Sequence, residues 1–126
     1  MQISRSQLDR LHAIVAADPV REVCGLLLGS DGVVDAIVEA ANVAPDPQMM
    51  FEIDPRVLIA ARKAERAGGA RIVGCYHSHP SGMARPSRWD REMSQPNDVW
   101  LIFAGADVTA WLRGTDEFQQ LGLEVR

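Results

Sequence analysis

The sequence predicts one α/β domain, in which a mixed β-sheet is layered with about three helices. Short apolar runs that end at glycine-containing turns predict strands. Between these runs, helix-capping residues precede apolar side chains at helical spacing. The chain has 126 residues, of which 47% are hydrophobic and 24% are charged, so it can bury one core of ordinary size. We therefore expect residues 1–126 to fold as a single domain.

The chain begins with a helix and a β-hairpin. Ser4 and Gln7 form the pattern of a capping box, and apolar side chains at helical spacing continue to about Asp18. The apolar run 22–28 predicts a strand. Because the tetrapeptide that follows it, Gly-Ser-Asp-Gly, is a turn signal, we expect a hairpin to a second strand over residues 33–40.

A proline-containing loop separates this hairpin from a second helix. Residues 42–48 are expected to form the loop, and residues 49–53 a short extended segment. Asp54 and Pro55 have the form of an N-cap and a first-turn proline, so a helix should begin there and stop at the glycine pair 68–69. Its buried face is expected to carry four apolar side chains, at Val57, Leu58, Ala61 and Ala64.

The second half of the chain is richer in strands. Residues 71–79 predict a buried strand that ends before Pro80, because proline cannot donate a hydrogen bond to a strand ladder. Pro86 and Ser87 begin a short helix that continues to about Ser94. Further apolar runs, separated by short turns, predict an antiparallel meander over residues 99–104, 108–113 and 118–125.

Charge and composition narrow the class of protein. The net charge of −4 argues against a general phosphate-binding surface, so we expect no nucleic-acid partner. No apolar signal region or membrane-length run is present, so we expect a cytoplasmic protein with no membrane partner. Cys24 and Cys75 are interpreted as buried thiols, with a disulfide between them left open. Arg85, Arg88 and Arg91 are interpreted as a solvated helix face or, alternatively, as a rim that meets an acidic partner.

A candidate metal site lies at the end of the strand over residues 71–79. His77 and His79 are two residues apart, so their side chains leave the same face of the strand, separated by about 7 Å along it. Two imidazoles at that spacing can close on one ion, with metal–nitrogen bonds of about 2.0–2.1 Å. Asp90 falls in the first turn of the next helix and can point back at the strand end. Two histidines and one carboxylate, with water in the fourth position, form the arrangement of a catalytic zinc site.

Other interpretations of the same residues stay open at this point. Ser87 and Asp90 also have the form of a capping box, and capping would compete with metal binding for one carboxylate. Cys75 lies on the same strand face as the two histidines and suggests a closed structural zinc site. It is, however, about 13 Å from His79 along an extended strand, so it is better explained as a core residue.

The complete pattern is His-x-His-Pro, five further residues, and then Pro-Ser-x-x-Asp. It resembles the motif of the JAMM (MPN+) zinc metallopeptidases, and the chain looks like a compact prokaryotic single-domain member of that family. The resemblance implies a curved mixed sheet flanked by helices, with the layering of cytidine deaminases. It also implies that His77, His79 and Asp90 hold Zn2+, that Glu22 transfers a proton, and that Ser87 supports an oxyanion. Glu22 is selected by this resemblance alone, because other glutamates in the chain are equally acidic.

What is known of the family implies the reaction. We expect a metallopeptidase that hydrolyses an amide or isopeptide bond after the C-terminal Gly-Gly of a ubiquitin-like or sulfur-carrier protein. The segment between Asp90 and Val99 leaves little room for the insertion that helps some deubiquitinases hold ubiquitin, which favours a small partner. The alternatives are a non-catalytic MPN-type scaffold without stoichiometric zinc, and a RadC-like nucleic-acid-associated protein, which the acidic charge disfavours.

Overall fold

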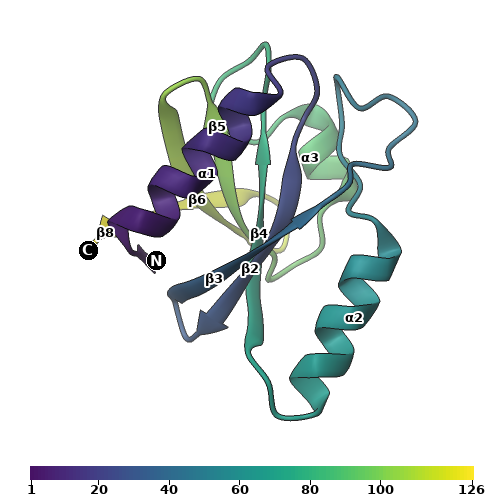
Figure 1. Ribbon diagram of the computed structural model, residues 1–126. Coiled ribbons are helices and arrows are strands. Elements are labelled where there is room, and N and C mark those ends of the chain that lie inside the picture. The colour runs from purple at the N-terminus through teal and green to yellow at the C-terminus, as the bar shows by residue number, and fades with distance from the viewer.

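The computed structural model describes residues 1–126 as an eight-stranded mixed sheet with three helices (Figure 1). The strand order is β7-β6-β5-β4-β2-β3-β1-β8. The helices are α1 (Arg5–Ala17), α2 (Pro55–Arg66) and α3 (Arg88–Met93). The strands are β1 (Gln2–Ile3), β2 (Cys24–Ser30), β3 (Val33–Ala40), β4 (Arg71–Ser78), β5 (Val99–Ala104), β6 (Asp107–Arg113), β7 (Phe118–Leu121) and β8 (Glu124–Val125). The predicted α/β class is confirmed.

The sheet is strongly curled. β7 and β8 form its two opposite edges, yet only Gly122 and Leu123 separate them in the chain. A flat sheet of eight strands would be about 34 Å wide, whereas a link of this length spans only about 11 Å. The edges must therefore approach each other, and Figure 1 shows β8 beside the N-terminus. The curvature expected from the family resemblance is confirmed.

The prediction of a single last strand over residues 118–125 is wrong. The chain leaves the meander after Leu121, and β8 pairs in parallel with β1 at the other edge of the sheet. β1 itself was not predicted, because two residues before a helix cap carry no strand periodicity. Ile3 on β1 is nevertheless fully buried, and Leu123 and Val125 pack against the same core. These short segments are strands because β1 pairs with β3 on one side and with β8 on the other.

The helix α1 covers one face of the sheet. The Gln7 N–H donates to Ser4 Oγ at 3.1 Å, as the capping pattern predicts. Leu8 and Leu11 are buried and share the core cluster with Tyr76 of β4. Because side chains alternate along a strand, the neighbours of Tyr76 point to the opposite face, which α2 and α3 border.

The hairpin of β2 and β3 is confirmed, but β2 begins at Cys24 and not at residue 22. Glu22 and Val23 precede the strand, so the Glu22 backbone takes no part in the ladder between strands. Cys24 lies opposite His77 and Leu26 lies opposite Cys75 in the pairing of β2 with β4. The two cysteines are therefore not directly opposed, and both are free thiols.

The helix α2 begins where predicted, with the Asp54 side chain accepting from the Arg56 N–H at 3.0 Å. The buried face expected for it is confirmed only in part: Val57, Leu58 and Ala61 are half-buried, Ala64 is exposed, and no residue of α2 is fully buried. Leu58 lines a cavity of about 420 Å³ between the helix and the sheet, so the apolar side of α2 stands off from β4. Amphipathic spacing shows which side of a helix faces the protein but not how closely the neighbour packs. None of the three helices has the length and apolar character that crossing a membrane requires.

Candidate metal centre

The end of β4 presents two histidines to one side and a serine to the other. His77 is fully buried and His79, just past the strand, is 8% exposed; the His79 N–H still donates to Phe103 O at 2.7 Å. Ser78 points the opposite way and accepts from the Val23 N–H at 2.9 Å. The alternation predicted from the i, i+2 spacing is present, and Ser78 bonds to the backbone on the side away from the histidines.

Three ligand atoms converge at this strand end. His77 Nε2 lies 3.1 Å from His79 Nε2 and 3.1 Å from Asp90 Oδ2, and His79 Nε2 lies 3.0 Å from the same carboxylate oxygen. The corners of such a triangle are about 1.8 Å from its centre, so an ion slightly above its plane would be about 2.0–2.1 Å from all three atoms. Two nitrogen lone pairs and a carboxylate oxygen directed at one point are a donor set that a divalent cation fits.

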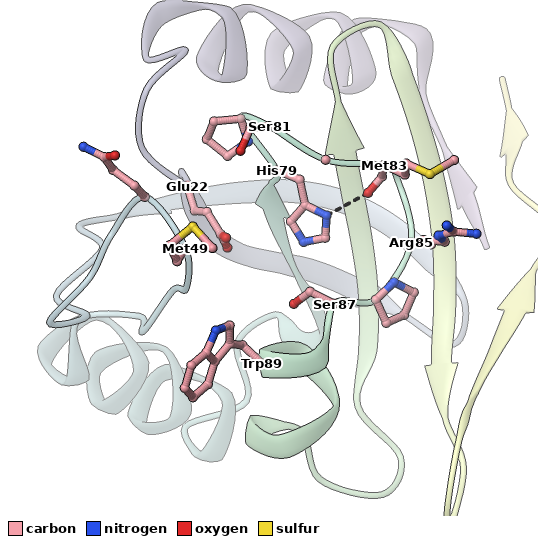
Figure 2. Close-up of a pocket in the computed structure, with 12 residues that line it drawn as sticks. Glu22, Met49, His79, Ser81, Met83, Arg85, Ser87 and Trp89 are labelled. Carbon is pink, nitrogen blue, oxygen red and sulfur yellow. Dashed lines mark hydrogen bonds between the residues drawn. The ribbon is translucent and has the colours of Figure 1, made fainter.

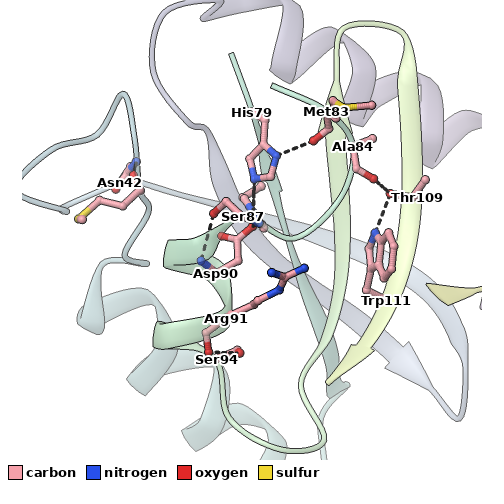
Figure 3. Close-up of polar contacts among 12 residues, drawn as sticks. Asn42, His79, Met83, Ala84, Ser87, Asp90, Arg91, Ser94, Thr109 and Trp111 are labelled. Atoms are coloured by element: carbon pink, nitrogen blue, oxygen red, sulfur yellow. Dashed lines mark hydrogen bonds and ion pairs between the residues drawn. The ribbon is translucent and has the colours of Figure 1, made fainter. Parts of the chain in front are cut away.

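The hydrogen bonding of His79 prepares its Nε2 for a metal. Its Nδ1 lies 2.8 Å from the backbone oxygen of Met83, which can only accept, so Nδ1 carries the proton. This tautomer leaves the Nε2 lone pair directed at His77 and Asp90. The loop that supplies Met83 is in turn tied to β6, where Thr109 Oγ1 donates to the backbone oxygen of Ala84 (Figure 3).

His77 is held by aromatic packing. Phe51 stacks on its ring with centroids 4.2 Å apart and planes 18° apart, and Trp100 meets it edge-on at 5.1 Å. Its Nδ1 is buried and has no hydrogen-bond partner. Sequence reasoning missed both aromatic contacts, because Phe51 reaches the site from a loop and Trp100 from a neighbouring strand.

The Asp90 carboxylate takes part in the capping box of α3 and also faces the two histidines. Its Oδ2 accepts from the Ser87 N–H at 2.9 Å, and the Asp90 N–H donates to Ser87 Oγ at 3.1 Å, which completes the capping box of α3. The same Oδ2 atom faces both histidines. The capping bond and the candidate metal position thus share one oxygen of the carboxylate, and the cap holds that oxygen beside both histidines.

Glu22 completes the cluster from a distant part of the chain. Its ligand atom and those of His77, His79 and Asp90 all lie within 4.8 Å of one another. Glu22 is 4% exposed and its Oε1 has no hydrogen-bond partner. Burial raises the pKa of Glu22 to about 7, with a smaller contribution from Asp90 and an opposing one from His79. A carboxylate with a pKa near neutrality can both accept and return a proton.

The other charges at the centre are shifted by the same surroundings. Burial alone would raise the pKa of Asp90, but the close contacts of its carboxylate with the imidazoles of His77 and His79 outweigh burial and lower that pKa. Burial lowers the pKa of His77, so its imidazole is favoured in the neutral form that can bind a metal. The centre therefore holds an ionised carboxylate beside a neutral imidazole.

A cavity of about 280 Å³ opens onto this cluster (Figure 2). Glu22, His79 and Ser87 line it, together with Trp89, which is 41% exposed. Arg85 also lines the cavity. Arg88 and Arg91 are exposed on α3, and Arg88 pairs with Glu92 at 3.2 Å. These two arginines match the expected solvated helix face, whereas Arg85 lies on the rim.

A family model described as prokaryotic homologues of the JAB domain matches residues 4–114. The chain belongs to this prokaryotic JAB family. It is 39% identical over 114 residues to a desampylase of Haloferax volcanii, which covers 87% of this chain and 82% of that protein. It is 30% identical over 125 residues to a probable TtuB-protein conjugate cleaving protease of Thermus thermophilus, with 99% and 82% covered. These relatives confirm the predicted family and the predicted class of metallopeptidase.

Solved structures confirm the JAB fold. The solution structure of a Desulfitobacterium hafniense protein superimposes with a TM-score of 0.87 at 27% identity, over 99% of this chain and 92% of that one. The crystal structure of a JAB1/MPN domain protein from Archaeoglobus fulgidus gives a TM-score of 0.66 at 21% identity, over 100% and 96%. The curled sheet and the three helices are thus the architecture of JAB domains.

The raised pKa of Glu22 predicts how the stability of the metal-free JAB domain depends on pH. Between pH 4.5, the ordinary pKa, and about pH 7, the folded protein binds more protons at Glu22 than the unfolded chain does. The free energy of unfolding therefore falls as the pH rises through this range. Glu22→Gln removes this dependence, so in chelator-treated protein its Tm should exceed that of the parent by a few degrees at pH 8 and by less at pH 4.5. A Tm difference that shrinks with rising pH would contradict the shift.

Proposed function

We propose that this JAB domain is a zinc-dependent peptidase that hydrolyses the amide or isopeptide bond after the C-terminal Gly-Gly of a ubiquitin-like or sulfur-carrier protein. The observation that carries the proposal is the convergence of Glu22, His77, His79 and Asp90 at the end of an open cavity. His77, His79 and Asp90 are the three zinc ligands of the proposal. A zinc ion held by them supplies Lewis acidity, which activates water at neutral pH.

The remaining steps belong to side chains of the chain itself. Glu22, whose carboxylate lies within 4.8 Å of the three ligand atoms, accepts the proton of the attacking water and delivers it to the leaving nitrogen. Ser87 lines the same cavity, and its hydroxyl can donate to the oxygen of the tetrahedral intermediate while its Oγ accepts from the Asp90 N–H. The buried ligands stay fixed, so the geometry needs little reorganisation during the reaction.

The substrate class rests on the relatives and on the space available. The Haloferax relative is named a desampylase and the Thermus relative a protease for TtuB-protein conjugates. A tail of two glycines has no side chains to accommodate, so its backbone can approach a narrow cavity closely. Met49 and Trp89 border the cavity and are 52% and 41% exposed, which leaves apolar surface for the folded body of the partner.

The test uses a ubiquitin-like protein whose C-terminal Gly-Gly is joined to a lysine side chain. The purified protein should cut after the second glycine, lose this activity with chelator and recover it when Zn2+ is added back. A substrate with Ala-Ala in place of Gly-Gly serves as the control and should be cut far more slowly. Cleavage that persists after the metal has been stripped would refute the proposed mechanism.

Ser87 offers a separate prediction, because its two functions can be divided by substitution. Ser87→Ala should lower kcat about 10²-fold through loss of the oxyanion donor, and should destabilise the fold by about 1 kcal/mol through loss of the α3 cap. Ser87→Asp keeps a capping side chain without a hydroxyl donor, so its stability should recover but its kcat should not. Ser87→Thr keeps both groups and should stay close to the parent. Steady-state kinetics and thermal unfolding of the three variants provide the check.

A further inference from the structure

The backbone of Glu22 is held by a loop and not by the sheet. Glu22 lies before β2, outside the strand ladder. Its N–H donates to Pro47 O at 2.7 Å, and its C=O accepts from Asn42 Nδ2 at 2.8 Å. Both partners belong to the β3–α2 loop, residues 41–54. The position of the Glu22 carboxylate at the metal centre therefore depends on the shape of this loop.

Asn42 is the residue that shapes the loop. Its Nδ2 donates to Glu22 O at 2.8 Å and to Met50 O at 3.0 Å, and its Oδ1 accepts from the N–H groups of Ala44 and Glu52, both at 3.0 Å. These four hydrogen bonds use the whole capacity of an amide side chain, which has two donor hydrogens and two acceptor lone pairs. A fifth, longer contact joins Nδ2 to Pro47 O at 3.5 Å. Asn42 thus joins the Glu22 backbone to both ends of the segment 44–52.

The same segment carries the aromatic ring that packs on a metal ligand. Phe51 lies between Met50 and Glu52, the two residues whose backbone groups bond to Asn42, and it stacks on His77 with centroids 4.2 Å apart. One half-buried asparagine, outside the cavity lining, therefore links the residue proposed as the base to the packing of His77.

We propose that Asn42 is a positioning residue for catalysis, which holds Glu22 at the metal centre by clamping the β3–α2 loop. This inference rests on the proposed function and deepens it. Asn42 contacts no ligand atom of the site, so the metal is retained without it. Its loss lets Glu22 move away from the position at which it exchanges protons. A displacement of about 1 Å at a reacting group can cost about 10²-fold in rate.

The kinetic test compares Asn42→Ala and Asn42→Asp with the parent protein, all loaded with Zn2+, on the Gly-Gly conjugate. Both variants should bind one zinc per chain and show kcat lowered about 10- to 100-fold, with KM changed less than about 3-fold. Asn42→Asp keeps the acceptor oxygen but cannot donate to Glu22 O. An unimpaired kcat for Asn42→Asp would overturn the proposal.

A double-mutant cycle with Glu22→Gln separates positioning from general weakening of the fold. If Asn42 acts through Glu22, Asn42→Ala should lower kcat in the parent but hardly at all in the Glu22→Gln background. Independent, multiplicative losses would overturn the proposal, as would loss of zinc from Asn42→Ala. If Glu22→Gln itself leaves kcat unchanged, Glu22 is not the base and the positioning role of Asn42 falls with it. If metal-dependent cleavage of the Gly-Gly conjugate is absent from the parent protein, the proposed function fails, so the two failures can be told apart.

Hydrogen exchange gives a readout that does not depend on activity. In Asn42→Ala the amides of Ala44 and Glu52 lose their acceptor and should exchange faster, together with the amide of Glu22. In Asn42→Asp only the Glu22 amide should exchange faster. The matched control is Gln7→Ala, which removes another side-chain amide that donates to a backbone oxygen, that of Asp35 at 3.0 Å, away from the site. Gln7→Ala should change neither kcat nor exchange in the β3–α2 loop, and equal changes in the control would contradict the inference.

Discussion

Glu22→Gln is expected to lower kcat by about 10²- to 10⁴-fold while leaving one zinc bound per chain. The amide has the shape of the carboxylate but cannot accept and return a proton. Glu22 sits within 4.8 Å of the three ligand atoms, is almost fully buried and has its pKa raised to about 7. Because the substitution removes proton transfer and not substrate contacts, the loss should appear in kcat and much less in KM.

The measurement is steady-state hydrolysis of a Gly-Gly conjugate, together with the metal content of the purified variant. Glu39→Gln is the matched control, since Glu39 lies on β3 with a 60% exposed side chain and pairs only with Arg10. That variant should keep the activity of the parent. If Glu22→Gln retains full kcat with zinc bound, proton transfer must be assigned to another group.

Asp90→Ala is expected to lose stoichiometric zinc and all metal-dependent cleavage, and also to weaken the fold. Its Oδ2 lies 3.0 and 3.1 Å from the two histidine nitrogens and accepts from the Ser87 N–H at 2.9 Å. Removing it takes away one of three ligands and half of the α3 capping box. Loss of a cap costs about 0.5–2 kcal/mol, so the metal-free variant should also unfold at a lower temperature than the metal-free parent.

Two further variants separate the ligand from the cap. Asp90→Asn keeps an oxygen that can accept from Ser87, so the metal-free protein should retain most of its stability but bind zinc weakly. Asp54→Ala removes a buried capping aspartate from another helix, the N-cap of α2, and should lower Tm without lowering zinc content. Zinc titration and thermal unfolding of the three variants give the result. Full zinc occupancy in Asp90→Ala would remove Asp90 from the ligand set.

Much of the site could be predicted from neighbouring residues in the chain. The i, i+2 spacing places His77 and His79 on one strand face, and the capping pattern places Asp90 in the first turn of α3. The structure brings these three side chains together as expected. Glu22 could be selected only through the family motif. The sequence alone does not distinguish a solvent-exposed glutamate from one that is buried at the site.

Other features had no signal in the sequence. The stacking of Phe51 on His77 and the clamp made by Asn42 bring together residues from a loop with little periodicity. The break after Leu121 and the pairing of β8 with β1 join two ends of the chain. The apolar side of α2 is incompletely buried because a cavity separates that helix from the sheet. Each of these depends on contacts between distant segments.

The sequence by itself determined the α/β class, the starts of the three helices and the ligand spacing at the end of β4. These properties depend on backbone conformation and side-chain direction over a few consecutive residues. Only the tertiary structure decided how far the sheet curls to bring its two edges near each other, and that Glu22 lies buried beside His79 and Asp90. The reason is physical: burial and the charges packed around Glu22 raise its pKa to about 7, and the charged residues His79, Asp90 and Asp46 lie far from it in the chain.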